Sequence, residues 1–235
     1  MEKKPIETLI PEPRTLLRNR RGGAANVILT ALLVEAARLV DEKYDIPVIE
    51  KAGRVAFKTK KGFLSLMDEI GLHAAISYLF TLSDASEPDD PFFKVYDNFF
   101  MPCESCKAIL DAYNAAEDKS TVKWVSQEEQ EKKVDDFLVL KLLIKRFQAV
   151  AFMTASEVVD AGVIRLKDVE EICRRDFGWE EGPFAMMNRM GIQEAMQMVT
   201  EKMELSHRKE INFPIPKLLI TQAQNNTPWP LNPSE

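Results

Sequence analysis

The sequence predicts an all-α protein made of two tandem, diverged helical-bundle repeats that pack against each other as a pseudo-dimer. Apolar residues recur every three or four positions over long stretches, which is typical of helices that bury one face. No β-rich segment of the kind that a dinucleotide-binding sheet needs is present. A spacing pattern in the first part of the chain also recurs in the second. With 235 residues and 46% apolar content, the chain can bury a real core.

The first strong helical pattern runs from about Ala24 to Asp41. A second helix is expected after Asp45, whose side-chain oxygen can accept from free N–H groups of the next turn, while Pro47 suits a first turn. After a polar break, a third helix ends at Gly71, so three helices are predicted for the first part.

Further along, an acidic loop is expected at about 83–91, a short helical stretch at 92–100 and a helix at 107–116. From 116 to 136 the sequence is heavily charged, and we predict the domain boundary there. The predicted units are 1–125 and a second, degenerate unit at 126–235. The charged run at 127–133 can equally be the solvated start of the next helix.

The internal repeat is carried by two pairs of glycines. In each part a second glycine follows the first after nine positions, at Gly62 and Gly71 and again at Gly182 and Gly191. The same register, with one two-residue gap, pairs Glu35 with Glu157, Phe57 with Phe177, and Leu66-Met67 with Met186-Met187.

These residues resemble a known domain. Gly22-Gly-Ala-Ala-Asn26 is followed nine positions later by Glu35-Ala36, Gly62 to Leu72 forms a second block, and the second part keeps Gly182-Pro-Phe184. The pattern is similar to the helical C-terminal domain of 3-hydroxyacyl-CoA dehydrogenases and of multifunctional β-oxidation enzymes, over about residues 20–80 and 137–200. Tandem copies of that domain occur in the multifunctional enzymes.

The chain also departs from that family pattern. The first copy has Gly23, Val27, Phe63 and His73 where the family has Phe, Arg, Pro and Asp, respectively. The second copy has Gln148 where the family Asn falls and Asn188 where the Asp falls. We therefore expect the second copy to be a structural partner rather than a second site.

The resemblance implies a role in 3-hydroxyacyl-CoA oxidation that this chain cannot perform alone. In the family the His–Glu pair and the cofactor lie in a Rossmann domain, and this sequence has no Gly-x-Gly-x-x-Gly after a strand. No cofactor is expected on the chain itself, and NAD is expected on a Rossmann partner. The expected partners are that dehydrogenase subunit, or further copies of this chain, and acyl-CoA. The alternative is a non-catalytic acyl-CoA-binding or scaffold protein that kept the fold.

The resemblance implies a supporting role for Asn26, whose carboxamide can donate to a substrate oxygen or orient a histidine of the partner. The alternative is that Asn26 only caps a helix. Arg20 and Arg21, with Arg14 and Arg18, form a basic cluster that can bind coenzyme A phosphates or an acidic face of a partner. The alternative is a solvated, loosely ordered arm.

Other candidate sites are weaker. Cys103-Glu-Ser-Cys106 is spaced like a redox pair or half of a zinc site, but it lacks the strand-then-helix setting of redox folds, so two small buried thiols are favoured. No metal is expected. The histidines, His73 and His207, are expected at surface or helix-end positions.

The net charge of −6 and pI near 5.2 disfavour nucleic-acid binding. Two apolar stretches, 22–37 and 137–155, are interrupted by charges and short for a bilayer, so they are interpreted as buried helices and no membrane partner is expected. The start of the sequence has no apolar signal region, and three cysteines favour a reducing compartment, which together predict a cytoplasmic location.

Overall fold

The computed structural model describes residues 23–84, 99–214 and 216–231, and within these ranges the regular secondary structure is helical, without strands. The all-α prediction is therefore confirmed. The α-helices are α2 (Gly23–Asp41), α3 (Ile46–Phe57), α4 (Phe63–Ile70), α5 (Leu72–Asp84), α7 (Glu104–Ala115), α8 (Gln127–Glu131), α9 (Phe137–Asp160), α10 (Leu166–Arg175), α11 (Pro183–Met190), α12 (Ile192–His207) and α13 (Lys217–Asn225), with one 3₁₀ turn at Lys119–Thr121.

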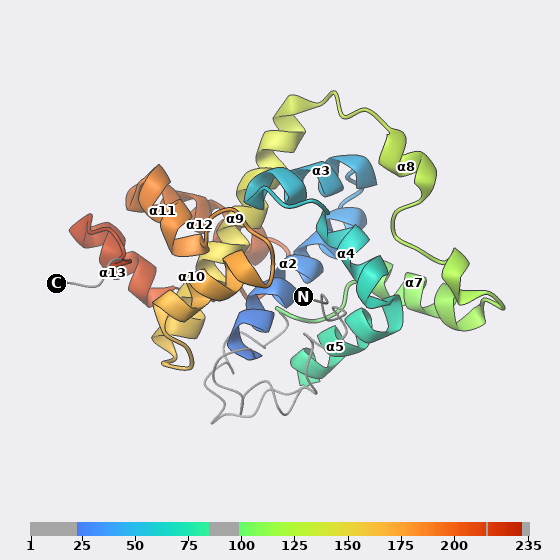
Figure 1. Cartoon of the computed structure of the whole chain (residues 1–235), viewed down its shortest axis with the longest axis horizontal. Coiled ribbons are helices and arrows are strands. Elements are labelled where there is room, and N and C mark those ends of the chain that lie inside the picture. Colours follow the sequence, from blue (N-terminus) through green and yellow to red (C-terminus); the bar gives the residue numbers. More distant parts are fainter. Residues whose placement is uncertain (1–22, 85–98, 215, 232–235) are drawn as a thin grey trace.

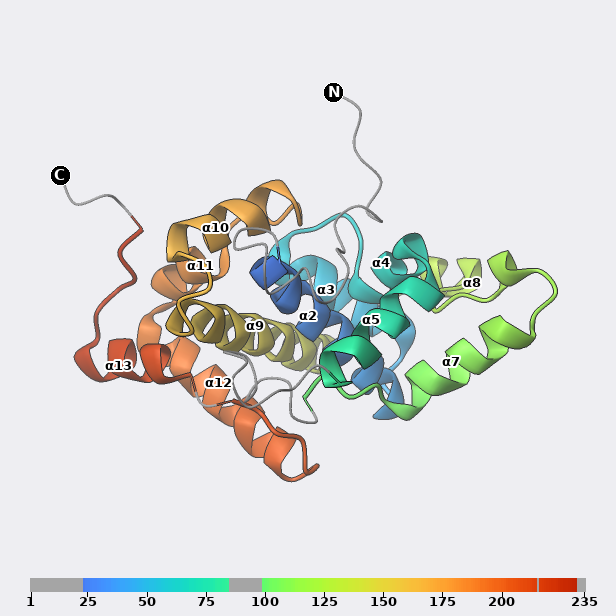
Figure 2. The ribbon, with the colours of Figure 1, turned by 90° about the horizontal axis from the view of Figure 1, so that it is seen from below.

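Helices α2 and α9 lie side by side at the centre of the molecule, as both Figure 1 and Figure 2 show. Helices α4, α5, α7 and α8 lie on one side of this central pair, and α10 to α13 lie on the other. Helix α9 contacts α3 and α2 from the first predicted unit and α11, α12 and α13 from the second. The 24 residues of α9 therefore touch both halves of the chain.

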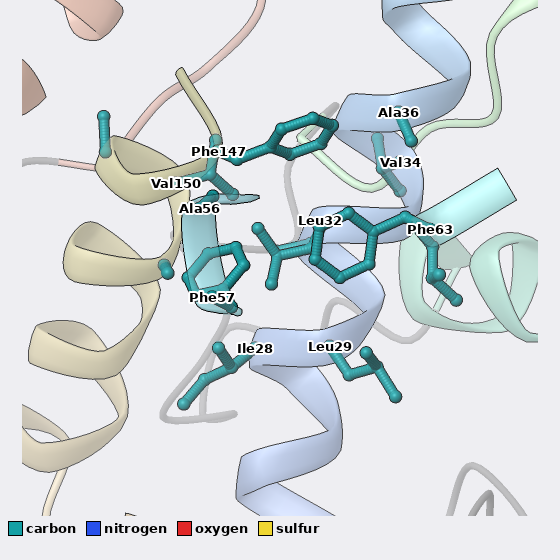
Figure 3. Packing of buried hydrophobic residues seen from close by; sticks show 14 of the residues in the cluster. Ile28, Leu29, Leu32, Val34, Ala36, Ala56, Phe57, Phe63, Phe147 and Val150 are labelled. Carbon is teal, nitrogen blue, oxygen red and sulfur yellow. The ribbon is translucent and has the colours of Figure 1, made fainter. Parts of the chain in front are cut away.

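The buried apolar residues form one cluster to which both predicted units contribute. Figure 3 shows Leu32 of α2 facing Phe57 of α3, with Phe63 of α4 and Phe147 of α9 close by. The rings of Phe63 and Phe147 have centroids 5.0 Å apart, and Phe57 stacks on Trp179 at 4.0 Å. The shared core fits the predicted packing of two units, while their superposition as a pseudo-dimer and the boundary at 125 stay predictions.

The starts of α4 and α11 are held in the same way. Glu50 of α3 accepts from the backbone N–H groups of the residues 14 and 15 positions later, at 2.8 and 3.2 Å, and Glu170 of α10 does the same, at 2.6 and 3.2 Å. A carboxylate near a helix N-terminus stabilises unpaired N–H groups. At Gly62 and Gly182 an added Cβ would lie 2.5 and 2.4 Å from that carboxylate, so only glycine permits this approach.

Several expectations about the first unit are confirmed and others are wrong. Helices α2, α3, α4 and α7 match the predicted ones within a few residues. Helix α5 was not predicted, although its apolar residues at 72, 75, 76 and 79 have helical spacing, because Gly71 was interpreted as the end of the helical part. Helix α5 also includes Ser83 and Asp84, where a loop was expected; residues 85–98 of that loop and of the expected short helix lie outside the described ranges.

Two local predictions are corrected. Asp45 precedes α3 as expected, but its side chain makes no capping hydrogen bond. Pro47 has no N–H to offer, and the N–H groups of Val48 and Ile49 bond to the backbone carbonyl of Asp45 instead. The charged run at 127–133 is not the start of α9, because its residues 127–131 form the separate short helix α8, whose N-terminus has a capping box of Ser126 and Glu129.

We predict that Leu32→Ala lowers the free energy of unfolding by about 2–5 kcal/mol, through lost burial and the cavity left behind. The Leu32 side chain is fully buried at the centre of the cluster in Figure 3, and Leu33 is 1% exposed, so Leu33→Ala is expected to cost a similar amount. Chemical denaturation gives the values. An unchanged midpoint in both variants would contradict the packing of α2.

Candidate functional site

Asn26 lies inside the first turn of α2. The helix begins at Gly23, so Asn26 does not occupy the N-cap position, and the capping alternative does not fit the structure. Asn26 is 6% exposed, and its backbone carbonyl accepts from the hydroxyl of Thr30 at 2.7 Å. Its carboxamide therefore lies at the positive end of a 19-residue helix, where a developing negative charge is stabilised.

The other predicted binding residues cannot be placed. Arg20 and Arg21, together with Arg14 and Arg18, lie outside the described residues. Their proposed contact with phosphate stays a prediction.

The residues that replace the family Asn and Asp in the second copy bind the main chain. The Gln148 carboxamide on α9 donates to the carbonyl of Ala56 at 3.3 Å and so joins α9 to α3. Asn188 on α11 accepts from the N–H of Trp229 at 2.7 Å and donates to its carbonyl at 3.0 Å. These contacts agree with a structural rather than catalytic use of both positions.

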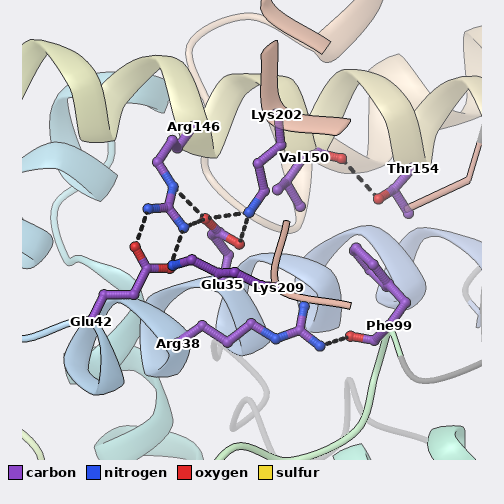
Figure 4. A network of polar contacts seen from close by, with 9 residues as sticks. All are labelled: Glu35, Arg38, Glu42, Phe99, Arg146, Val150, Thr154, Lys202 and Lys209. Carbon is purple, nitrogen blue, oxygen red and sulfur yellow. Dashed lines mark hydrogen bonds and ion pairs between the residues drawn. The ribbon is translucent and has the colours of Figure 1, made fainter. Parts of the chain in front are cut away.

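The most unusual polar feature is a buried ionic cluster that joins α2, α9 and α12 (Figure 4). The Glu35 carboxylate accepts from Arg146 Nε at 2.8 Å and from Lys202 Nζ at 2.9 and 2.7 Å. The side chains of Glu35, Arg146 and Lys202 are only 1%, 5% and 4% exposed. Burial without pairing would be very costly for each charge, so these contacts fix the three helices relative to one another.

The cluster extends towards solvent through a second carboxylate. Both terminal nitrogens of Arg146 donate to Glu42, at 2.6 and 2.8 Å, in the bidentate geometry that suits a guanidinium. Lys209 reaches the same carboxylate at 2.6 Å and is about one third exposed. Next to this cluster, Arg38 donates to the carbonyl of Phe99 and lies 5.4 Å from the centre of its ring.

The charges of the cluster alter one another's pKa values. Burial alone would raise the pKa of Glu35, but the neighbouring charges of Arg146 and Lys202 outweigh it and lower the pKa from 4.5 to about 2. For Lys202 burial is the largest influence, and it lowers the pKa from 10.5 to about 8 even though Glu35 acts in the opposite direction. Both groups carry charge near neutral pH.

We predict that Glu35 makes the free energy of unfolding depend on pH in the acidic range. Because its pKa is lower in the folded chain, the unfolded chain takes up the proton first, and stability contributed by the carboxylate is lost as the pH falls from about 4.5 towards 2. The difference in unfolding free energy between wild type and Glu35→Gln should therefore shrink by on the order of 1–2 kcal/mol between about pH 5 and pH 3. Urea denaturation at both pH values measures it, and a constant difference would contradict the assignment.

This cluster was not predicted from the sequence. In the sequence, Glu35 belongs to the repeat and to the family pattern, and Arg146 is one of the charges that interrupt the apolar stretch 137–155. That charge was the one available signal, because a cation inside a buried helix requires a buried anion. Nothing local pointed to Glu35 or Lys202 as its companions.

The two predicted thiols lie at the beginning of α7. Cys103 is the N-cap residue and Cys106 lies three positions later, with their sulfurs 3.6 Å apart. Cys106 is buried as predicted, but Cys103 is partly exposed, so the prediction of two buried thiols is wrong for Cys103. Within the described ranges no group of three or more His, Cys, Asp or Glu is arranged to hold a metal ion.

The histidines and a surface groove lie apart from these features. His73 is exposed on α5 and His207 is the exposed last residue of α12, as expected. A groove of about 1370 Å³ runs between α3, α4 and the segment 120–135, and charged side chains such as Lys51, Arg54 and Asp68 line it. Neither Asn26 nor the ionic cluster borders this groove.

Helices α2 and α9 include nearly all of the two apolar stretches noted in the sequence. The described side chains of the first stretch are buried, and so is most of α9 from Leu143 onward, but Phe137, Leu138 and Leu142 are exposed, so the expectation of a buried helix is wrong for the start of α9. In the part of the chain that the structure describes, no helix combines the length and apolarity needed to cross a membrane.

Comparison with known proteins gives a match to a protein family. Residues 143–226 match the family model of the 3-hydroxyacyl-CoA dehydrogenase C-terminal domain, whereas no curated protein and no solved structure shows a significant match. The matched segment starts within α9 and ends just after α13. The resemblance of residues 20–80 to the same domain is not part of this match and stays a prediction. Over residues 143–226 the chain is therefore similar to the C-terminal domain of 3-hydroxyacyl-CoA dehydrogenases.

Proposed function

We propose that this chain is the helical subunit or C-terminal part of a 3-hydroxyacyl-CoA dehydrogenase and completes the acyl-CoA site of an NAD-binding Rossmann partner. The observation that carries the proposal is the family match over residues 143–226 in a chain whose described part is all helical. In this proposal the substrate is an acyl-CoA and the metabolism is of the β-oxidation type.

In this proposal NAD binds to the partner rather than to this chain. Its described residues form no sheet, and its sequence has no glycine-rich turn between a strand and a helix where a pyrophosphate could lie. The cofactor and the base that takes the hydroxyl proton therefore belong to the partner in this proposal.

Asn26 is the residue proposed to act from this chain. Oxidation of the hydroxyl places negative charge on the substrate oxygen, and a fixed carboxamide N–H at the start of α2 can donate to that oxygen or to a histidine of the partner. Arg20 and Arg21 are proposed to contact the coenzyme A phosphates. The main-chain contact of Gln148 supports the view that the second copy has no equivalent site.

An exposed apolar surface supports the existence of a partner. Phe137, Leu138 and Leu142, in the first turns of α9, are 72%, 84% and 46% exposed, and Val55 of α3 is 48% exposed. Large apolar side chains gathered on a surface are typical of interaction sites. In this proposal the start of α9 contacts either the Rossmann partner or a second copy of the chain.

Reconstitution tests the proposal. The purified chain is mixed with candidate Rossmann subunits, complex formation is followed by gel filtration, and NADH production from a 3-hydroxyacyl-CoA is measured. Activity is expected only in the mixture. If none of the candidate Rossmann subunits forms a complex or an active enzyme with this chain, the proposal is contradicted.

The second candidate function is an acyl-CoA-binding or scaffold protein without a part in catalysis. The observation that favours it is Val27, which is 1% exposed and packed in the apolar core at a position where the family pattern has an arginine. An acyl-CoA-binding protein of this kind would bind its ligand without any partner, which separates the two candidates experimentally.

A further inference from the structure

We propose that Cys103 and Cys106 form a reversible intramolecular disulfide by exchange with a low-molecular-weight disulfide such as glutathione disulfide. The proposed dehydrogenase role uses neither thiol, so this site is independent of it. The two sulfurs are 3.6 Å apart in the described structure, and bond formation needs them to approach to about 2.0 Å. Cysteines separated by two residues at the start of a helix can close this distance by side-chain rotation.

The exposures of the two thiols set the order of reaction. Cys103 is partly exposed at the N-cap of α7, whereas Cys106 is 1% exposed one turn inside the helix. An external disulfide can therefore reach the sulfur of Cys103 but not that of Cys106. Cys106 is therefore placed to act as the resolving thiol, which attacks the mixed disulfide formed on Cys103.

The hydrogen bond between the two thiols keeps the proton of the pair on Cys103. This bond lowers the pKa of Cys106 and raises the pKa of Cys103, while burial and the carboxylate of Asp41 raise the pKa of both thiols. Exposure rather than acidity therefore makes Cys103 the sulfur that meets an external disulfide.

The reaction proceeds in two exchanges. Cys103 passes its proton to the Cys106 sulfur as it attacks glutathione disulfide, which forms a Cys103–glutathione bond and releases one glutathione thiolate. Cys106 then gives its proton to solvent and attacks the Cys103 sulfur, which forms the Cys103–Cys106 bond and releases the second glutathione. Two protein thiols are oxidised, and one glutathione disulfide is reduced to two thiols.

The N-terminal end of α7 is held mainly by bonds that this chemistry leaves intact. Asp41 of α2 accepts from the N–H groups of Glu104 and Ser105 at 3.0 and 2.8 Å, and from the Ser105 hydroxyl. Asp41 also has a hydrogen bond with the Cys103 side chain, which a disulfide would remove. The bonds to Glu104 and Ser105 do not involve either sulfur, so α7 can stay in contact with α2 in the oxidised and the reduced chain.

The test incubates the full, folded chain with glutathione and glutathione disulfide at varied ratios. The chain is then unfolded in acid, the free thiols are alkylated in denaturant, and the labels are located by mass spectrometry. The chain has three cysteines, and Cys173 is buried at 0% exposure, so it serves as an internal unreactive thiol. With glutathione disulfide in excess, the expected result is the loss of two hydrogens and of the alkyl labels on Cys103 and Cys106 only. Excess glutathione should restore both labels.

Two variants test the order of attack. Cys106→Ser should stop at a mixed disulfide on Cys103, whereas Cys103→Ser, which keeps a good N-cap residue, should take up no glutathione. Glutathione on Cys106 of the Cys103→Ser variant would overturn the proposed order. Two thiols that stay reduced in the wild-type chain at every ratio would overturn the proposal itself, whatever the outcome of the reconstitution experiment.

Discussion

Glu35→Gln is expected to lower the free energy of unfolding by about 3–5 kcal/mol, the range found when one partner of a buried ion pair is removed. The substitution preserves the size of the side chain but removes its charge. In this variant Arg146 keeps Glu42 as a partner. For Lys202, by contrast, both hydrogen bonds of the ammonium group are donated to the Glu35 carboxylate. A buried cation would thus lose its counter-charge while another cation remains beside it.

A matched control lies at the solvent end of the same cluster. Lys209→Met removes an ion pair to Glu42 in which the lysine is 35% exposed, and it should cost at most about 1 kcal/mol. Adding Lys202→Met to Glu35→Gln should recover part of the loss, because the unpaired buried cation is then removed. Denaturant titration gives all three values, and a loss below about 1 kcal/mol for Glu35→Gln would show that the cluster does not hold α2, α9 and α12 together.

Asn26→Asp is expected to lower turnover of the reconstituted enzyme by about 10²–10³-fold, the loss typical of one preorganised donor. An ionised Asp cannot donate a hydrogen bond, and it adds negative charge where negative charge develops. Because Asn26 is 6% exposed, the variant also needs a stability measurement, so that loss of donation is not confused with loss of the fold. Asn26→Ser keeps a hydrogen-bond donor on a shorter side chain, and so tests whether the donor must extend as far as the carboxamide does.

Gln148→Ala is the control for this experiment in the second copy. Gln148 donates to the carbonyl of Ala56, so its removal should reduce stability by about 1 kcal/mol and leave turnover near the wild-type value. Near-full turnover of Asn26→Asp in an intact complex would show that Asn26 has no part in catalysis.

The sequence was sufficient to predict the helices whose apolar stripes are local. Helices α2, α3, α4 and α7 follow from three- and four-residue spacing together with glycine and proline signals, because these act within one or two turns. The same spacing existed in α5, and the error there was to take Gly71 as an end rather than as a sharp link between two helices. Its φ of 99° permits the direct turn from α4 into α5.

The ionic cluster could not be predicted in the same way. Glu35 is separated by 111 residues from Arg146 and by 167 residues from Lys202, and no periodicity relates such distant positions. The sequence also indicates Cys103 and Cys106 as a candidate pair of thiols. It does not give the distance between their sulfurs, or their unequal exposure, which depends on how α7 packs against α2. The matching carboxylates at Glu50 and Glu170 were overlooked, although each precedes its glycine by the same number of residues.

We propose that the acyl-CoA site is complete only when this chain and a Rossmann partner are together. Calorimetric titration of an acyl-CoA into the chain alone, into the partner alone and into their complex measures this dependence. We expect little heat from the chain alone, weak heat from the partner and tight, saturable binding by the complex. Saturable binding of the same strength by the chain alone would contradict this proposal and support an independent acyl-CoA-binding protein.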